Sequence, residues 1–80
     1  MVKVSYEISF KKRIKKIKNN QIKDQIKKQI LKIVNNPNIG KPMKFSRKGT
    51  RELYIKPFRL SYFYQNDEII FTDLYHKNEQ

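Results

Sequence analysis

The chain has 80 residues, of which 19 are Lys or Arg and 7 are Asp or Glu, so its formal net charge is +12. It has no Cys and a single His, His76, which excludes disulfides and Cys nucleophiles and leaves no ligand set for a structural zinc ion. No apolar run is long enough to span a membrane and the N-terminus has no signal-peptide core, so we expect a cytoplasmic protein that forms one domain over residues 1–80.

The N-terminal part of the chain predicts a strand followed by two helices. Apolar and polar residues alternate over residues 2–9, which is typical of a half-buried strand. From Phe10 the apolar residues follow helical spacing, and Asn19-Asn20 interrupts the stripe before it resumes. We therefore expect antiparallel helices over about 10–18 and 21–35, with Asn19 or Asn20 as the N-cap of the second. A single bent helix is the alternative.

The C-terminal part predicts a cationic loop and three strands. The loop runs from Asn35 to about Gly49 and contains three prolines or glycines before its end. Segments rich in β-branched and aromatic residues follow at Arg51–Lys56, Phe58–Gln65 and Ile69–Tyr75, separated by the turn-prone pairs Lys56-Pro57 and Asn66-Asp67. The order β-α-α-β-β-β predicts an α+β fold, in which a two-helix hairpin packs on a small, twisted, mostly antiparallel four-stranded sheet.

Turn geometry predicts how the last two strands pair. If Asn66-Asp67 forms a two-residue hairpin loop, Arg59 lies opposite Leu74 and Pro57 lies opposite His76. Alternation of side chains then defines an apolar face that must pack on the helices. That face holds Phe58, Leu60, Tyr62, Tyr64, Ile69, Phe71 and Tyr75. Asp73 is the misfit, because it falls on the same face.

The same rule applied to Lys56-Pro57 predicts the pairing of the first two of these strands. Tyr54 lies opposite Arg59 and Glu52 lies opposite Ser61, while Leu53 and Ile55 join the apolar face. The polar face then gathers Glu52, Tyr54, Arg59, Ser61, Thr72 and His76. In this register Arg59 and His76 are diagonal neighbours, with backbones roughly 7–8 Å apart.

A cation beside an imidazole on an open basic surface suits metal-free cleavage of RNA, which needs no cofactor. His is the residue type that exchanges protons most readily near neutral pH, so His76 suits acid or base work. Arg59 could bind the phosphate through paired donors, Glu52 is a candidate base and Tyr54 a candidate stacking group. The alternatives are an Arg59 that pairs with Glu52 or Asp73 and a His76 that is a surface residue.

The distribution of positive charge favours a polyanion or an acidic protein as partner. Residues 11–32 hold ten basic residues against Asp24 alone, and residues 41–59 hold seven against Glu52 alone. Solvated lysines on a helix face are the simpler interpretation. The candidate RNA-binding residues are Lys41, Lys44, Arg47, Lys48, Arg51, Tyr54 and Lys56.

Short motifs in this order resemble the RelE/ParE superfamily of toxin–antitoxin toxins. They are Asn36-Pro37, Gly40-Lys41-Pro42, Arg51-Glu52-Leu53, Phe58-Arg59-Leu60-Ser61-Tyr62 and Tyr75-His76. By this resemblance, Arg59 contacts the scissile phosphate and His76 protonates the leaving oxygen. The resemblance further implies cleavage of mRNA in the ribosomal A site and a cognate antitoxin, with an acidic or amphipathic segment, that wraps the basic surface.

Departures from the RelE-like pattern keep other functions open. Tyr54 stands where many members have Arg or Lys, and Met43 stands where YoeB-like members have a carboxylate. The first alternative is a ParE-like toxin that inhibits a DNA topoisomerase by binding. The second is a basic nucleic-acid-binding domain without catalysis.

Overall fold

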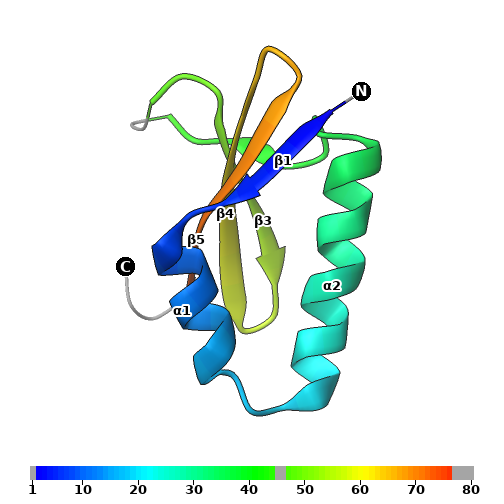
Figure 1. Cartoon of the computed structure of the whole chain (residues 1–80), viewed down its shortest axis with the longest axis vertical. Coiled ribbons are helices and arrows are strands. Elements are labelled where there is room, and N and C mark those ends of the chain that lie inside the picture. Colours follow the sequence, from blue (N-terminus) through cyan, green and yellow to red (C-terminus); the bar gives the residue numbers. More distant parts are fainter. Residues whose placement is uncertain (1, 45–46, 77–80) are drawn as a thin grey trace.

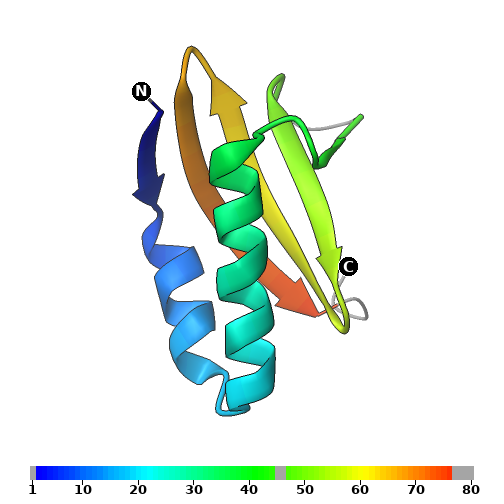
Figure 2. The same ribbon diagram turned by 90° about the vertical axis from the view of Figure 1, so that its right-hand side faces the viewer.

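The computed structural model describes residues 2–44 and 47–76. Its elements are β1 (Lys3–Tyr6), α1 (Ile8–Lys16), α2 (Asn20–Asn35), β2 (Lys41–Pro42), β3 (Thr50–Ile55), β4 (Phe58–Gln65) and β5 (Glu68–His76), and all of them except β2 are labelled in Figure 1. The strand order is β1-β5-β4-β3-β2, in which β1 is parallel to β5 and the other pairs are antiparallel. The helix α2 lies across one face of the sheet, with α1 beside it (Figure 2). The predicted α+β fold and element order are confirmed, and the sheet gains a fifth, two-residue strand.

The two helices are separate, so the single bent helix is excluded. Asn19 is the N-cap of α2, and its side-chain oxygen accepts hydrogen bonds from the backbone N–H groups of Gln21 at 2.9 Å and Ile22 at 3.2 Å. The first helix begins at Ile8, two residues earlier than predicted. Pairing with β5 continues as far as the bond from Glu7 N–H to Phe71 O at 2.9 Å, and the chain becomes helical directly after it.

The core lies between the helices and the apolar face of the sheet. Its fully buried members come from α2 and the two central strands, and they are Ile26, Ile33, Leu60, Tyr62, Ile69, Phe71 and Leu74. At the α1 end, the rings of Phe10 and Tyr6 lie 5.6 Å and 5.2 Å from that of Phe71. The helix stripes predicted from apolar spacing therefore meet the strand face predicted from alternation.

Both predicted two-residue hairpin loops are present. Asn66 and Asp67 have φ angles of 54° and 60°, the left-handed conformation that a two-residue loop between twisted strands requires. Lys56-Pro57 is the other loop, with a cis peptide bond. Across it, Tyr54 pairs with Arg59 and Glu52 pairs with Ser61, as predicted.

The register between β4 and β5 changes partway along, which corrects the predicted pairing. From Gln65 to Tyr62 the predicted register holds, but a β-bulge between Ser61 and Tyr62 shifts it by one residue. Arg59 therefore pairs with Tyr75 instead of Leu74, and Phe58, not Pro57, pairs with His76.

The bulge also resolves the Asp73 misfit. Thr72 is the extra residue, and its hydroxyl lies 2.7 Å from that of Ser61. Beyond it Leu74 enters the core with 1% exposure, and Asp73 accepts the Leu74 N–H and pairs with Arg13 at 3.8 Å. A regular strand would bury a carboxylate and expose a leucine, which is unfavourable on both counts. Tyr75, predicted in the core, consequently faces the other way.

Tyr62 joins the sheet to the loop that precedes β2. Its phenol donates to Pro37 O at 2.7 Å and accepts from Gly40 N–H at 2.8 Å. The loop approaches so closely that a Cβ on Gly40 would lie 2.7 Å from Tyr62 Cε1, so glycine is needed there. Burial raises the pKa of the Tyr62 phenol above its ordinary value of 10.0, although the Gly40 N–H and the Arg51 charge oppose the rise.

Stability is expected to depend on the Tyr62 proton at alkaline pH. Because the folded state holds that proton more tightly than the unfolded chain, the contribution is complete below about pH 10 and is lost as pH rises further. Tyr62→Phe should cost about 1–3 kcal/mol at pH 7, since Gly40 N–H loses its acceptor, and should flatten the alkaline loss. Urea unfolding from pH 7 to 11 measures both. Tyr6→Phe is the control. If the free energy of unfolding falls with alkaline pH as steeply in Tyr62→Phe as in the wild type, the alkaline loss does not come from Tyr62.

Candidate active site

The polar face of the sheet carries a compact cluster of Glu52, Arg59 and Tyr75. Glu52 lies on β3, Arg59 on the neighbouring strand β4, and Tyr75 on β5 directly opposite Arg59. Arg59 Nη1 donates to Glu52 Oε1 at 2.9 Å, and the Tyr75 phenol donates to Glu52 Oε2 at 3.1 Å. Both carboxylate oxygens are therefore held, from two different strands.

The cluster is partly shielded from solvent. The side chains of Arg59 and Glu52 are 29% and 21% exposed. Arg59 Nε is buried and has no hydrogen-bond partner among the described residues. Buried donors are normally satisfied, so Arg59 keeps one unused donor, which solvent does not reach in this conformation.

An open hollow of about 410 Å³ gives access to this cluster from the β3 side. Its lining residues are Ile39, Lys41, Glu52, Leu53, Tyr54 and Arg59. Tyr54 is 52% exposed, and the centroid of its ring lies 5.9 Å from Arg59 Cζ. The hollow thus combines a carboxylate, a guanidinium, an ammonium and an exposed aromatic ring, which are groups that can bind a phosphate and a base.

The structure does not bring Arg59 and His76 together on one face, which corrects the prediction. His76 pairs with Phe58, and the centroids of their rings lie 5.7 Å apart in an edge-to-face arrangement. Since Leu74 points into the core, alternation places His76 on the core side of β5 and Tyr75 on the side of Arg59. The bulge at Thr72 is the physical reason why Tyr75, and not His76, lies on the same face as Arg59.

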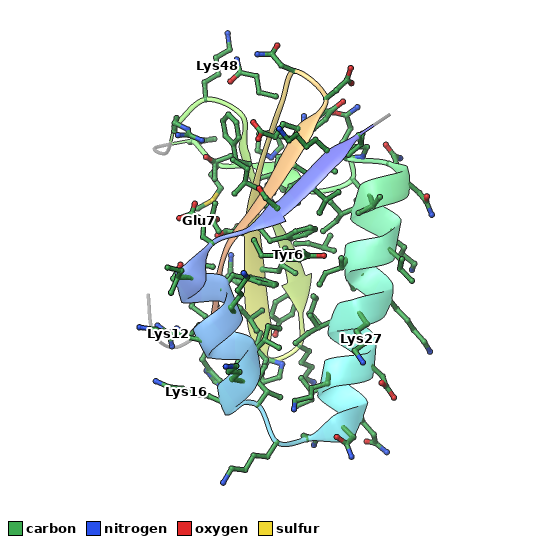
Figure 3. The ribbon with its side chains drawn as sticks, in the orientation of Figure 1. Tyr6, Glu7, Lys12, Lys16, Lys27 and Lys48 are labelled. Atoms are coloured by element: carbon green, nitrogen blue, oxygen red, sulfur yellow. The ribbon has the colours of Figure 1, made fainter. Side chains whose placement is uncertain are left out.

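The other predicted RNA-binding residues lie in three places. Lys41 on β2 lines the hollow beside Glu52, and the two residues are opposite each other in the β2–β3 strand pairing. Lys44 and Lys48 line a second hollow of about 500 Å³ near the start of β3, and Lys48 projects at the end of the molecule remote from the helix turn (Figure 3). Lys56 is exposed in the β3–β4 turn.

Two predicted RNA-binding arginines are engaged within the chain. Arg51 donates from Nη1 to Gly40 O at 2.7 Å and to Asn38 O at 3.2 Å, so it anchors the loop before β2. The Arg47 guanidinium lies 3.9 Å above the ring of Phe63. Arg47 remains exposed to solvent, whereas Arg51 is half-buried.

Sequence reasoning missed Tyr75 as a member of the cluster. Unbroken alternation along the strand would place Tyr75 in the core. The signal that could have found the bulge was Asp73, a carboxylate in an apolar row next to a leucine on the polar side. A β-bulge of one residue before Asp73 moves Asp73 out of the apolar row and Leu74 into it.

The opposite side of the molecule carries an apolar groove with a cationic rim. The groove of about 530 Å³ runs between the helices, with a floor of Tyr6, Phe10, Ile14, Ile26 and Ile30 and a rim of Lys11, Lys15, Lys23 and Lys27. Figure 3 shows Tyr6 directed from β1 towards α2, and Lys12 and Lys16 projecting away from the body of the molecule. This surface is separate from the Glu52–Arg59 cluster.

Two further features concern metals and membranes. Within residues 2–44 and 47–76, no group of three or more His, Cys, Asp or Glu side chains is placed to hold a metal ion. In the same part of the chain, neither helix is long and apolar enough to cross a membrane.

The fold defines a small α+β protein with a polar hollow on its sheet, and comparison with known families specifies which kind. Residues 4–80 match the family described as ParE toxin of type II toxin-antitoxin system, parDE. The chain therefore belongs to this family and is a toxin of the RelE/ParE fold. The comparison with curated protein sequences found no match.

Solved structures of related toxins share the fold over almost the whole chain. The isolated E. coli RelE toxin is 12% identical, with a TM-score of 0.80, and the match covers 95% of this chain and 84% of that one. In the E. coli DinJ–YafQ complex the match is 19% identical, covers 98% and 96% of the two chains and has a TM-score of 0.82. A copper-bound mutant toxin from Helicobacter pylori is 29% identical, with coverage of 99% and 98% and a TM-score of 0.78.

Proposed function

We propose that this toxin is a ribosome-dependent mRNA endoribonuclease that inhibits translation in the cytoplasm, with residues 1–80 as one toxin domain. The observation that carries the proposal is the Glu52–Arg59 pair at 2.9 Å, on neighbouring strands and reached through a hollow that also holds Lys41 and Tyr54. A base and a phosphate-binding cation in contact are what cleavage by the neighbouring 2′-OH requires.

In the proposed reaction an RNA phosphate enters the hollow and binds Arg59. Glu52 accepts the proton of the 2′-OH, the 2′-oxygen forms a bond to phosphorus, and the bond from phosphorus to the 5′-oxygen breaks. Arg59 donates to the non-bridging oxygens, whose charge grows in the transition state. The 5′-oxygen takes a proton from water, since the predicted acid His76 faces the other side of the sheet. The products are a 2′,3′-cyclic phosphate and a 5′-hydroxyl.

Cations around the hollow would hold the RNA backbone on either side of the cleaved bond. Lys41 lies in the hollow, Lys44 and Lys48 line the second hollow near the start of β3, and Lys56 is exposed in the β3–β4 turn. Lysines that contact phosphates add affinity without sequence preference, and the affinity falls steeply with salt. Tyr54 would stack on a base next to the bound phosphate.

The protein partner we propose is a cognate antitoxin with an acidic or amphipathic segment. The apolar groove between the helices, with its four rim lysines, complements such a segment in both hydrophobicity and charge. The fold of this chain matches YafQ in a structure solved together with DinJ, which supports a similar assembly.

Mapping of mRNA 5′ ends after induced expression tests the proposed activity. In-frame cuts within translated codons are expected in the wild type, and the same cuts are expected in His76→Ala because His76 lies off the cleft face. Loss of the cuts in a folded His76→Ala protein would show that His76 takes part in cleavage. Absence of cuts in the wild type would refute nuclease activity.

A ParE-like toxin that inhibits a DNA topoisomerase by binding is the second candidate. One observation favours it: the chain matches the ParE toxin family. Growth arrest without mRNA cuts, together with inhibition of purified gyrase, would select this function over cleavage.

A further inference from the structure

The β-bulge in β5 places a third side chain beside the Glu52–Arg59 pair. We propose that Tyr75 is a positioning residue of this site, which keeps Glu52 oriented to accept a proton while Arg59 binds the phosphate. The inference rests on the proposed nuclease function and deepens it, because it assigns Tyr75 a role in the same cleft.

The geometry separates the tasks of the two carboxylate oxygens. Glu52 Oε1 accepts from Arg59 at 2.9 Å, and Oε2 accepts from the Tyr75 phenol at 3.1 Å. A phosphate that binds Arg59 competes with Oε1 for the guanidinium donors. As Arg59 turns to the phosphate, Oε1 becomes available to the 2′-OH proton, and Tyr75 still holds Oε2. Tyr75 therefore limits the rotation of the carboxylate at the step in which its ion pair opens.

Packing of the core explains why Tyr75, and not its neighbours, has this position. Leu74 is 1% exposed and fills the apolar face, which directs Tyr75 to the opposite side of the strand. Hydroxyl groups hold the bulge that makes this possible, since Thr72 Oγ1 lies 2.7 Å from Ser61 Oγ and also donates to Ser61 O at 3.1 Å. The position of Tyr75 in the site thus depends on the β-bulge in β5, which is favoured because it allows Leu74 to be buried.

A purely structural role for the phenol makes a different prediction. If Tyr75 only stabilised the sheet, its loss would act on folding and would add to the effect of any other substitution. If it acts through Glu52, its loss has no further effect once the carboxylate is gone, so the two substitutions are not additive.

Single-turnover cleavage of an mRNA in the A site of purified ribosomes tests the inference. Tyr75→Phe should slow cleavage at saturating toxin by about 10- to 100-fold, the range that one hydrogen bond to a charged group corresponds to, with little change in the half-saturating concentration. The double variant Glu52→Gln/Tyr75→Phe should cleave as slowly as Glu52→Gln alone. Ser9→Ala is the matched control, because Ser9 Oγ donates to Thr72 O at the bulge and does not contact Glu52.

The outcomes separate this inference from the function on which it rests. Wild-type rates in Tyr75→Phe, or additive losses in the double variant, would overturn the role of Tyr75 while the nuclease stands. An equal loss in Ser9→Ala would assign the effect to the bulge as a whole and also overturn it. No cleavage by wild-type toxin would overturn the proposed function and the inference with it.

Discussion

Arg59→Ala toxin is expected to cleave mRNA at least about 100-fold more slowly than the wild type. Arg59 is the guanidinium that contacts Glu52 in the hollow, and its removal leaves the Glu52 carboxylate without its cation, so that it repels the entering phosphate. The loss of transition-state stabilisation from one such donor is on the order of 100- to 1000-fold. Single-turnover cleavage on ribosomes measures it, and growth of cells that express the variant should recover in parallel.

A second arginine provides the matched control for this substitution. Arg13→Ala also removes a guanidinium and an ion pair, the one with Asp73 at 3.8 Å, but it lies on α1. We expect its cleavage rate to stay within about threefold of the wild type. Thermal unfolding should show little change for Arg13→Ala, because its ion pair is about two-fifths exposed and such pairs contribute about 0–1 kcal/mol. Arg59→Ala should lose more stability, because it leaves the largely shielded Glu52 carboxylate without its cation. Undiminished cleavage by folded Arg59→Ala would rule out the proposed site.

Phe71→Ala is expected to destabilise the fold by about 3–5 kcal/mol. Phe71 is fully buried, and its ring lies 5.2 Å, 5.6 Å and 6.0 Å from those of Tyr6, Phe10 and Tyr62. It joins β1, α1 and β4 to the strand that carries Tyr75. A chain of 80 residues has a free energy of unfolding of only about 4–12 kcal/mol, so the substitution should remove a large fraction of it.

Urea unfolding followed by circular dichroism measures the effect of Phe71→Ala. Ile8→Ala is the control, since Ile8 is 70% exposed and its loss should change the free energy of unfolding by no more than about 0.5 kcal/mol. The same midpoint in Phe71→Ala and in the wild type would show that the aromatic cluster does not stabilise the core.

Local rules were sufficient for most of the fold. The change from alternating to helical spacing after the first strand, the cap at Asn19 and the loop at Asn66-Asp67 are all present. Each depends on residues adjacent in sequence, whose preferences are strong where φ is positive or backbone donors must be satisfied. The pairing of Glu52 opposite Ser61 was likewise predicted, because only one tight turn separates the two strands.

Local rules did not predict the register of β5, because that register depends on which of its side chains are buried in the core. The register of β5 depends on whether Leu74 or Asp73 is buried against α1 and α2, and no turn near these residues encodes that choice. The sequence by itself determined the order of elements, the apolar faces as far as the bulge in β5, and the presence of Glu52 and Arg59 on neighbouring strands. The tertiary structure decided that Tyr75 and not His76 joins them, because burying a leucine is favourable and burying a carboxylate is not.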